Sequence, residues 1–327
     1  MTNDQANTTS PWHSGERSLH ERLGTAEKME QVGRRVIRDH MPDQHRQFFT
    51  QLPFMVAGAV DANGDVWATV LEGEPGFMQS PDPRTLTLRA LPGVGDPVRE
   101  HVVEGAAMGL LGIELHTRRR NRLNGHVLNT DAGGFTLQVG ESFGNCPKYI
   151  QKRQFSFARP PQQPYTGVVE RLTALDAEAI AFIRSADTFF IASSHRGDAE
   201  HPIQSVDVSH RGGQPGFVRV EGDTLQIPDF VGNGFFSTFG NLLTNPRAGL
   251  VFIDFSSGDM LQLTGHAEVD FGGAPVEAFQ GAERLWTFRV DQLVRRRSAL
   301  ALRWDSSEAS PYSLMTGSWG GLPPLTS

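Results

Sequence analysis

The amino-acid sequence predicts a mainly β protein built from two tandem domains, each an antiparallel barrel or sandwich with connecting helices. Short apolar segments alternate with Gly-, Asp- and Asn-containing turns along most of the 327 residues, which suits antiparallel strands better than βαβ units. Residues 75–126 and 215–266 also share nine identities at a constant offset of 140, where chance gives roughly three. The sequence therefore indicates a tandem duplication.

The identities that define the repeat gather at the two ends of the aligned windows. They are Pro75/Pro215, Gly76/Gly216, Phe77/Phe217, Gly109/Gly249, Leu110/Leu250, Ile113/Ile253, Leu123/Leu263, Gly125/Gly265 and His126/His266. A feature that only one copy carries is a better candidate for function than one that both copies need for folding. We therefore expect a structural role for His126 and His266.

Composition and charge narrow the class of protein. The net charge of −7 argues against a general nucleic-acid or anionic-membrane binder, because such surfaces are built from excess Lys and Arg. Cys146 is the only cysteine, so an intrachain disulfide is impossible and a cytoplasmic location is expected. The first thirty residues lack the apolar core of a signal peptide, and no run approaches the 18 apolar residues of a membrane span.

The first half is predicted to start with a polar region in which Thr25 caps a helix running to about Arg38. Residues 54–60 then form a buried strand that turns through Asp61-Ala62-Asn63-Gly64 and returns over residues 66–70, which makes a β-hairpin. Further strands are expected at residues 85–88, 107–115, 122–128 and 134–139.

A Pro- and Gln-rich segment interrupts this pattern, and prolines without N–H donors do not sit inside a sheet. We therefore place a linker at residues 158–170. The expected domains are a polar tail and helix over residues 1–45, a first barrel over 46–157, a second barrel over 171–305 and a tail over 306–327.

The second half is predicted to begin with a helix that Thr173 caps, with Asp176 at the third helical position. Strands follow at residues 189–192, 205–209, 216–220, 224–227, 248–255, 260–269 and 286–290. Between two of them, residues 228–246 form a Gly-rich loop and then a helix that Ser237 or Thr238 can cap and that must end before Pro246. Free N–H groups at such a helix start favour an anion.

Two basic clusters stand out in this acidic chain. Residues 118–122 contain four arginines and join two apolar runs. We interpret them as a charged hairpin tip, with an anion site as the alternative, and Arg295-Arg296-Arg297 is interpreted in the same way.

The second half contains the motifs Asp207-Val208-Ser209-His210-Arg211-Gly212-Gly213, Ile227-Pro228-Asp229-Phe230-x-Gly232-Asn233 and residues 241–250. These three motifs resemble those of the FMN-binding split-barrel proteins of the pyridoxamine 5′-phosphate oxidase-like family. The resemblance implies a six-stranded Greek-key split barrel, with FMN bound at the interface of two such barrels. Single-barrel relatives dimerise to form that interface, whereas this chain carries both barrels, the first of them degenerate. Whether the chain itself forms a homodimer stays open.

The resemblance also implies which residues bind FMN. The strand of Asp207, Val208, Ser209, His210 and Arg211 lines the flavin ring, and Pro228, Asp229 and Phe230 contact it. The loop of Asn233, Phe235 and Thr238 holds the phosphate with Arg211, and Asn241 anchors the next helix. Residues 144–151 resemble a Cys-x-Lys segment near the flavin, which adds Asn145 and Lys148 from the first half. Relatives often carry a cation where this chain has Gly234, and Lys148 or Arg211 can supply that charge.

The implied function is an FMN-dependent oxidoreductase whose small-molecule substrate, electron donor and catalytic residues the family does not define. No metal is expected. A non-catalytic flavin- or haem-binding module is the alternative, because the one nearby imidazole, His210, is interpreted as a surface residue. A serine hydrolase using Ser142 of Gly140-x-Ser142-x-Gly144 is a minor alternative, although Pro147 follows where a hydrolase needs a helix.

Overall fold

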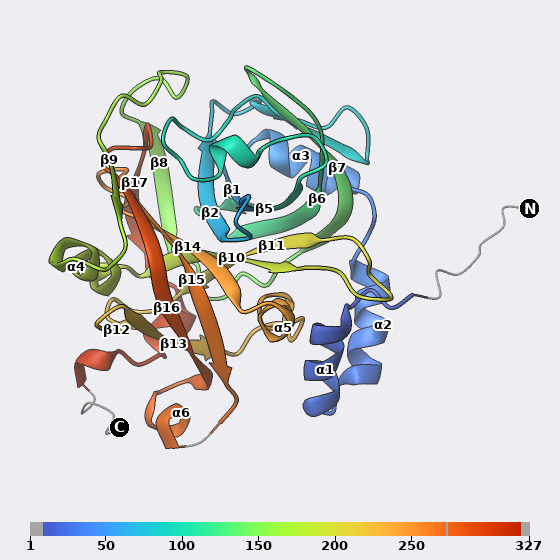
Figure 1. The fold of residues 1–327 in the computed structure, drawn as a ribbon, viewed down its shortest axis with the longest axis vertical. Coiled ribbons are helices and arrows are strands. Elements are labelled where there is room, and N and C mark those ends of the chain that lie inside the picture. The colour runs from blue at the N-terminus through green and yellow to red at the C-terminus, as the bar shows by residue number, and fades with distance from the viewer. Residues whose placement is uncertain (1–8, 273, 322–327) are drawn as a thin grey trace, which may run out of the picture.

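The computed structural model describes residues 9–272 and 274–321, and it is mainly β, as the sequence predicts (Figure 1). Residues 54–144 form a seven-stranded antiparallel sheet that we call the first barrel. Its strands are β1(Phe54–Val60), β2(Val66–Glu72), β3(Met78–Gln79), β4(Thr85–Leu88), β5(Ala107–Glu114), β6(Arg119–Asp131) and β7(Gly134–Gly144).

The second large sheet is formed by residues 188–296, which we call the second barrel. Its strands are β10(Thr188–His195), β11(Ser205–Gly212), β12(Arg219–Glu221), β13(Thr224–Phe230), β14(Arg247–Ile253), β15(Met260–Asp270) and β16(Ala282–Arg296). An additional strand, β9(Val169–Leu172), pairs with β16.

The two barrels share one strand order. It is β2-β1-β5-β6-β7-β4-β3 in the first and β11-β10-β14-β15-β16-β13-β12 in the second, so each has one short strand more than the six expected. Each barrel also makes the same close contact with the other. A Cβ atom on Gly109 would lie 2.5 Å from the Val206 carbonyl oxygen, and one on Gly249 would lie 2.5 Å from that of Val66. The repeated Gly109/Gly249 pair therefore lets each barrel approach the hairpin of its neighbour.

An apolar core fills the interface between the barrels. Buried side chains from the first barrel, such as Val56 and Leu111, pack with Ala192, Val208 and Val251 from the second. Burial of this face from water stabilises the docked pair. The two barrels thus share a core in addition to the core inside each one.

The helices connect and cover the sheets. They are α1(Ser14–Arg22), α2(Ala26–Val36), α3(Asp43–Thr50), α4(Ala177–Ser185), α5(Ser237–Thr244), α6(Ala274–Ala278) and α7(Pro311–Leu314), with 3₁₀ turns at η1(Arg99–His101) and η2(Trp319–Gly321). The sequence did not predict α1, which packs on α5 of the second barrel (Figure 1). Their closest approach is at two glycines, because a Cβ on Gly15 would lie 2.0 Å from the Gly240 carbonyl oxygen.

The helix caps differ from three of the predictions. Thr25 does precede α2, but its side chain makes no capping hydrogen bond. Thr173 is not the cap of α4; Asp176 is, and its carboxylate accepts from the Ala179 N–H at 2.8 Å. Helix α5 starts one residue after a left-handed Phe236 rather than on a Ser or Thr cap.

Strands near the ends of the two halves pair with each other. β8(Lys152–Phe157) pairs with β17(Leu302–Glu308), so the end of the expected first domain forms a two-stranded sheet with a strand that spans the boundary between the expected second barrel and the expected tail. β9 begins inside the expected linker. Among the described helices, none combines the length and apolar character needed to cross a membrane.

Candidate functional site

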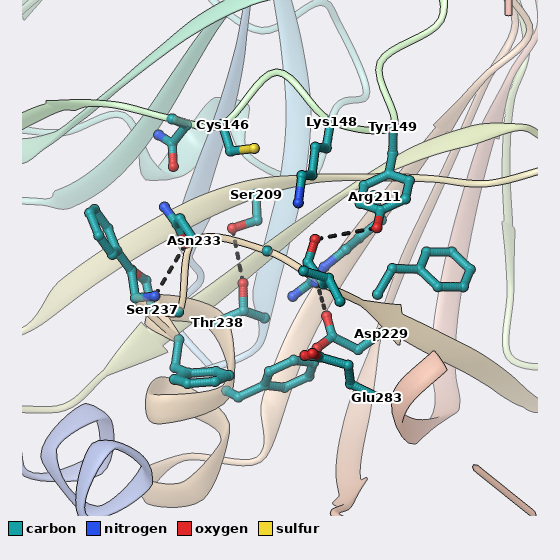
Figure 2. Close-up of a pocket in the computed structure, with 18 of the residues that line it drawn as sticks. Cys146, Lys148, Tyr149, Ser209, Arg211, Asp229, Asn233, Ser237, Thr238 and Glu283 are labelled. Atoms are coloured by element: carbon teal, nitrogen blue, oxygen red, sulfur yellow. Dashed lines mark hydrogen bonds and ion pairs between the residues drawn. The ribbon is translucent and has the colours of Figure 1, made fainter. Parts of the chain in front are cut away.

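A cavity of about 770 Å³ lies where the end of the first barrel meets the second (Figure 2). Its walls come from residues 145–149 after β7, from β11 and β13, from the loop and first turn of α5, and from the α1–α2 connection. Figure 2 shows Cys146, Lys148 and Tyr149 on one side and Ser237 and Thr238 on the other. The size is that of a small-molecule or cofactor site.

The floor of the cavity is a hydrogen-bonded group from both barrels. Ser209 Oγ on β11 accepts from Arg122 Nη2 on β6 at 2.6 Å and from Thr238 Oγ1 on α5 at 3.0 Å. Nearby, the side-chain amide nitrogen (Nδ2) of Asn145 is buried without a hydrogen-bond partner among the described residues. An unpaired buried donor of this kind is costly unless a ligand satisfies it.

Positive charge dominates the cavity. Lys28, Arg120 and Lys148 line it, and none of them has a carboxylate partner within the described part of the chain. Burial, together with the charge of Arg122, lowers the pKa of Arg120 to about 9. The guanidinium is therefore held in surroundings that disfavour its charge, and an anion in the cavity would relieve this. In a protein of net charge −7, such a cluster indicates an anionic ligand.

The other three cations of the cavity lining, Arg122, Arg211 and Arg284, are paired with the carboxylates of Asp207, Asp229 and Glu283. Arg211 is hydrogen-bonded to Asp229, and Arg284 Nε lies 3.1 Å from the other carboxylate oxygen of that residue. Burial raises the pKa of Asp229, while the two guanidiniums oppose the rise. Arg211 is thus held by a partner and is not the free cation that the sequence suggested for a phosphate.

Aromatic side chains cover the cavity. Tyr149 stacks at a tilt against Phe230, with ring centroids 5.2 Å apart, and burial raises its pKa to about 12. Tyr149 and Phe236 have positive φ values of 64° and 60°. Left-handed backbone is strained for such residues and tends to persist where function requires it. Both strained residues border the same cavity.

Eleven of the fourteen site residues predicted from the sequence line this cavity. They are Ser209, His210, Arg211, Pro228, Asp229, Phe230, Asn233, Phe235, Thr238, Asn145 and Lys148. The other three lie elsewhere. Asp207 is ion-paired with Arg122, Val208 is buried in the interface core, and Asn241 donates to Ser193 Oγ at 3.0 Å.

Sequence reasoning missed the arginines of the first barrel. The interpretation of residues 118–122 as a hairpin tip is wrong for Arg120 and Arg122, which lie within β6 and line the cavity. The interpretation of Arg295 and Arg296 as a tip is also wrong, because both are buried in ion pairs at the end of β16. The alternation of Leu123, Gly125 and Val127 after Arg122 predicted a strand over residues 122–128, and the observed strand extends back to Arg119.

Two further interpretations are corrected by burial. His210 is buried rather than exposed, and burial lowers the pKa of its imidazole well below the usual value. Ser142 lies inside β7, is fully buried and sits 2.9 Å from His45 Nδ1. It therefore does not occupy the exposed strand-to-helix turn that a hydrolase nucleophile needs.

One histidine cluster has potential metal-ligand atoms in proximity. Ring nitrogens of His13 and His195 and a carboxylate oxygen of Asp198 lie within 4.8 Å of one another. The two imidazoles are stacked, however, with centroids 4.1 Å apart and planes at 13°. An ion bound by both rings would have to lie in both planes, so we assign no metal to this cluster.

Comparisons with known proteins give similar folds over part of the chain. No protein-family model matches, and no curated protein matches. Solved structures that resemble it include HupZ of Group A Streptococcus (17% identity, TM-score 0.28, 42% of this chain and 98% of that one). An FMN-binding protein from Syntrophomonas wolfei (11%, 0.27, 37% and 87%) and a FAD-binding protein from Mesorhizobium loti (12%, 0.26, 40% and 98%) are two others.

Proposed function

We propose that this protein is an FMN-dependent oxidoreductase that binds the flavin in the cavity between its two barrels. The observation that carries the proposal is the cluster of Lys28, Arg120 and Lys148, three cations without described carboxylate partners in one cavity. A phosphate would supply the missing charge through charge-assisted hydrogen bonds. The second-half motifs that resemble FMN-binding split barrels border the same space.

The other walls suit a flat ring with polar edges. Tyr149, Phe230 and Phe236 provide aromatic surface, and the backbone of β11 and β13 runs along the cavity. FMN would supply hydride or electron transfer, while the chain would orient the ring and pair its phosphate. Because both barrels of one chain line the cavity, this site needs no residue from a second copy.

A flavin-binding module without turnover is the second candidate, and His210 favours it. His210 is the one imidazole among the described residues of the cavity lining, and its lowered pKa keeps it neutral at ordinary pH. A neutral, buried imidazole cannot serve as a general acid at neutral pH. A module of this kind would bind the flavin, but His210 would not donate a proton in a reaction.

The test begins with the visible spectrum of protein purified without added ligand, followed by release and mass analysis of any pigment. Bound FMN supports the proposal, FAD revises the cofactor, and a haem spectrum supports a haem-binding module. Steady oxidation of NADH or NADPH by the loaded protein then separates an enzyme from a module. A colourless protein that does not bind added FMN or riboflavin would falsify the flavin assignment.

A further inference from the structure

The first barrel contains a buried carboxylate at a position that corresponds to the floor of the cavity in the second. Asp96 lies in the loop after β4, as residues 231–236 lie in the loop after β13. Its side chain is turned inward and is fully buried. The corresponding loop of the second barrel contains no acidic residue.

Four donors converge on the Asp96 carboxylate. Arg296 Nη2 and Thr69 Oγ1 donate to it, Gln262 Nε2 lies 3.2 Å away, and the Val98 N–H donates at 2.9 Å. The residues Thr69, Gln262 and Arg296 are themselves buried, with at most 2% of their surface exposed. A guanidinium together with neutral donors is a typical environment for a bound oxoanion.

These donors correspond, strand by strand, to residues of the cavity floor. Thr69 faces Ala57 across the β1–β2 ladder as Ser209 faces Ile191 across β10–β11. Gln262 takes the place of Arg122, since they face Val251 and Leu111 in the matching ladders. Arg296 corresponds to Asn145. Arg296 faces Met260 across the β15–β16 ladder, and the backbone N–H of Asn145 donates to the carbonyl oxygen of Arg120 at the matching place beside β6. The same strand positions are therefore used twice. In one place their side chains bind Asp96, and in the other they border the cavity, where Arg122 is held by Asp207.

We propose that the barrel interface retains a second anion-binding site, at the end of the first barrel, and that the carboxylate of Asp96 is its permanent ligand. Removal of that carboxylate opens the site to a small oxoanion such as formate. The inference does not depend on a flavin in the second barrel. It predicts that this site takes up no anion from solution in the wild-type protein, because the protein itself supplies the anion.

The test uses the full chain with Asp96→Ala. Loss of the carboxylate leaves the Arg296 guanidinium buried and unpaired, which destabilises the fold, so the melting temperature should fall. Formate, titrated against chloride at constant ionic strength, should raise the melting temperature progressively with its concentration, as expected for a ligand of the folded state. The wild-type protein should not respond. Asp187→Ala, which removes the carboxylate that binds Arg153, should respond less, because Arg153 is not part of a four-donor frame.

A second variant keeps the test decisive. Asp96→Ala combined with Arg296→Met removes both charges of the pair, and this double variant should fold and show no response to formate. If Asp96→Ala fails to fold in chloride, its refolding yield in formate replaces the melting temperature as the readout. No rescue of Asp96→Ala, or an equal formate response in the double variant, would overturn the proposal.

Discussion

Arg122 Nε lies 2.9 Å from Asp207 Oδ1, and this ion pair joins β6 of the first barrel to β11 of the second beneath the cavity. Both side chains are nearly inaccessible, with 6% and 5% of their surface exposed. Asp207 therefore neutralises an arginine of the other barrel instead of lining the cavity as expected. It follows that the cavity floor exists only when the two barrels are docked.

Two further carboxyl groups lie near this pair, and they predict how stability depends on pH. Burial raises the pKa of Glu16 well above its usual value, and the charges of Glu141 and Asp207 add to the rise. Burial raises the pKa values of Glu141 and Asp207 as well. A carboxyl group with a raised pKa takes up a proton on folding, so its contribution to stability falls as pH rises from about 4.5 through the folded pKa.

Glu16→Gln should therefore increase the free energy of unfolding at pH 8, by about 1.4 kcal/mol for each unit of pKa shift removed. The amide can still accept from the His13 N–H that Glu16 binds at 3.1 Å. Urea unfolding between pH 5 and pH 8 measures the effect, with the exposed Glu27→Gln as control. An unchanged pH dependence would mean that Glu16 is not the group that takes up the proton.

The second prediction concerns the cations that pair with the proposed phosphate. Arg120→Gln and Lys148→Ala should each weaken FMN more than riboflavin, by about 1.5–3 kcal/mol for a charge-assisted hydrogen bond. Arg211→Ala should weaken both ligands alike, because its guanidinium is bound to Asp229. Fluorescence titration of both ligands measures this, with the exposed Arg289→Gln as control. Equal losses for FMN and riboflavin in the first two variants would show that these side chains do not contact the phosphate.

The third prediction is a stoichiometry of one flavin per chain. The cavity with its three unpaired cations is bordered by the motifs of the second barrel, whereas Asp96 fills the corresponding position at the first. Pigment released from the saturated protein and quantified against protein concentration gives the ratio. A ratio near two would show that the first barrel also holds a flavin.

The strands were predictable because their signals are local, and the repeat located both barrels. β1 and β4 have the predicted bounds, and the bounds of most other predicted strands differ from the observed bounds by a few residues. The two sheets share one strand order, and the duplication itself stays a prediction. By contrast, β8 and β17 pair residues about 150 positions apart, and sequence periodicity contains no information on such partners.

The candidate site was predictable in the motif-bearing half and only partly in the other. Ser209, Asn233 and Thr238 border the cavity with their motifs. Arg120 was not predicted as a strand residue, and neither Arg120 nor Arg122 was predicted as a site residue, because a run of arginines normally marks a solvated turn. Helix α1 was not predicted, because its packing on α5 depends on the Gly15–Gly240 contact and not on a regular apolar stripe.

That contact gives the fourth prediction. Gly15→Ala would place a Cβ 2.0 Å from the backbone oxygen of Gly240, which neither backbone can avoid without movement. We expect α1 to pack less tightly on α5, which should lower the melting temperature. FMN binding should also weaken, because the chain after α1 lines the cavity through Thr25 and Lys28. Gly272→Ala, at a position with open space around it, is the control. An unchanged FMN affinity would separate α1 from the site.

The last prediction tests whether the two halves form one site. A fragment that begins near Pro164 keeps β11, β13 and α5 but loses residues 145–149, Arg120, Arg122 and α1, and therefore most of the free positive charge of the cavity. It also exposes Val208, Val251 and the other apolar side chains that the first barrel covers, so it should self-associate or aggregate.

Its FMN affinity should fall, and a separate fragment of residues 1–160 should restore it, because the pocket depends on the interface and not on the covalent link. Sedimentation measures the association state, and flavin fluorescence measures binding before and after mixing. The matched mixture carries Arg122→Gln in the first fragment, which removes the charge opposite Asp207 and should recover less affinity. A second-half fragment that stays monomeric and binds FMN as tightly as the whole chain would show that the first barrel contributes nothing to the site.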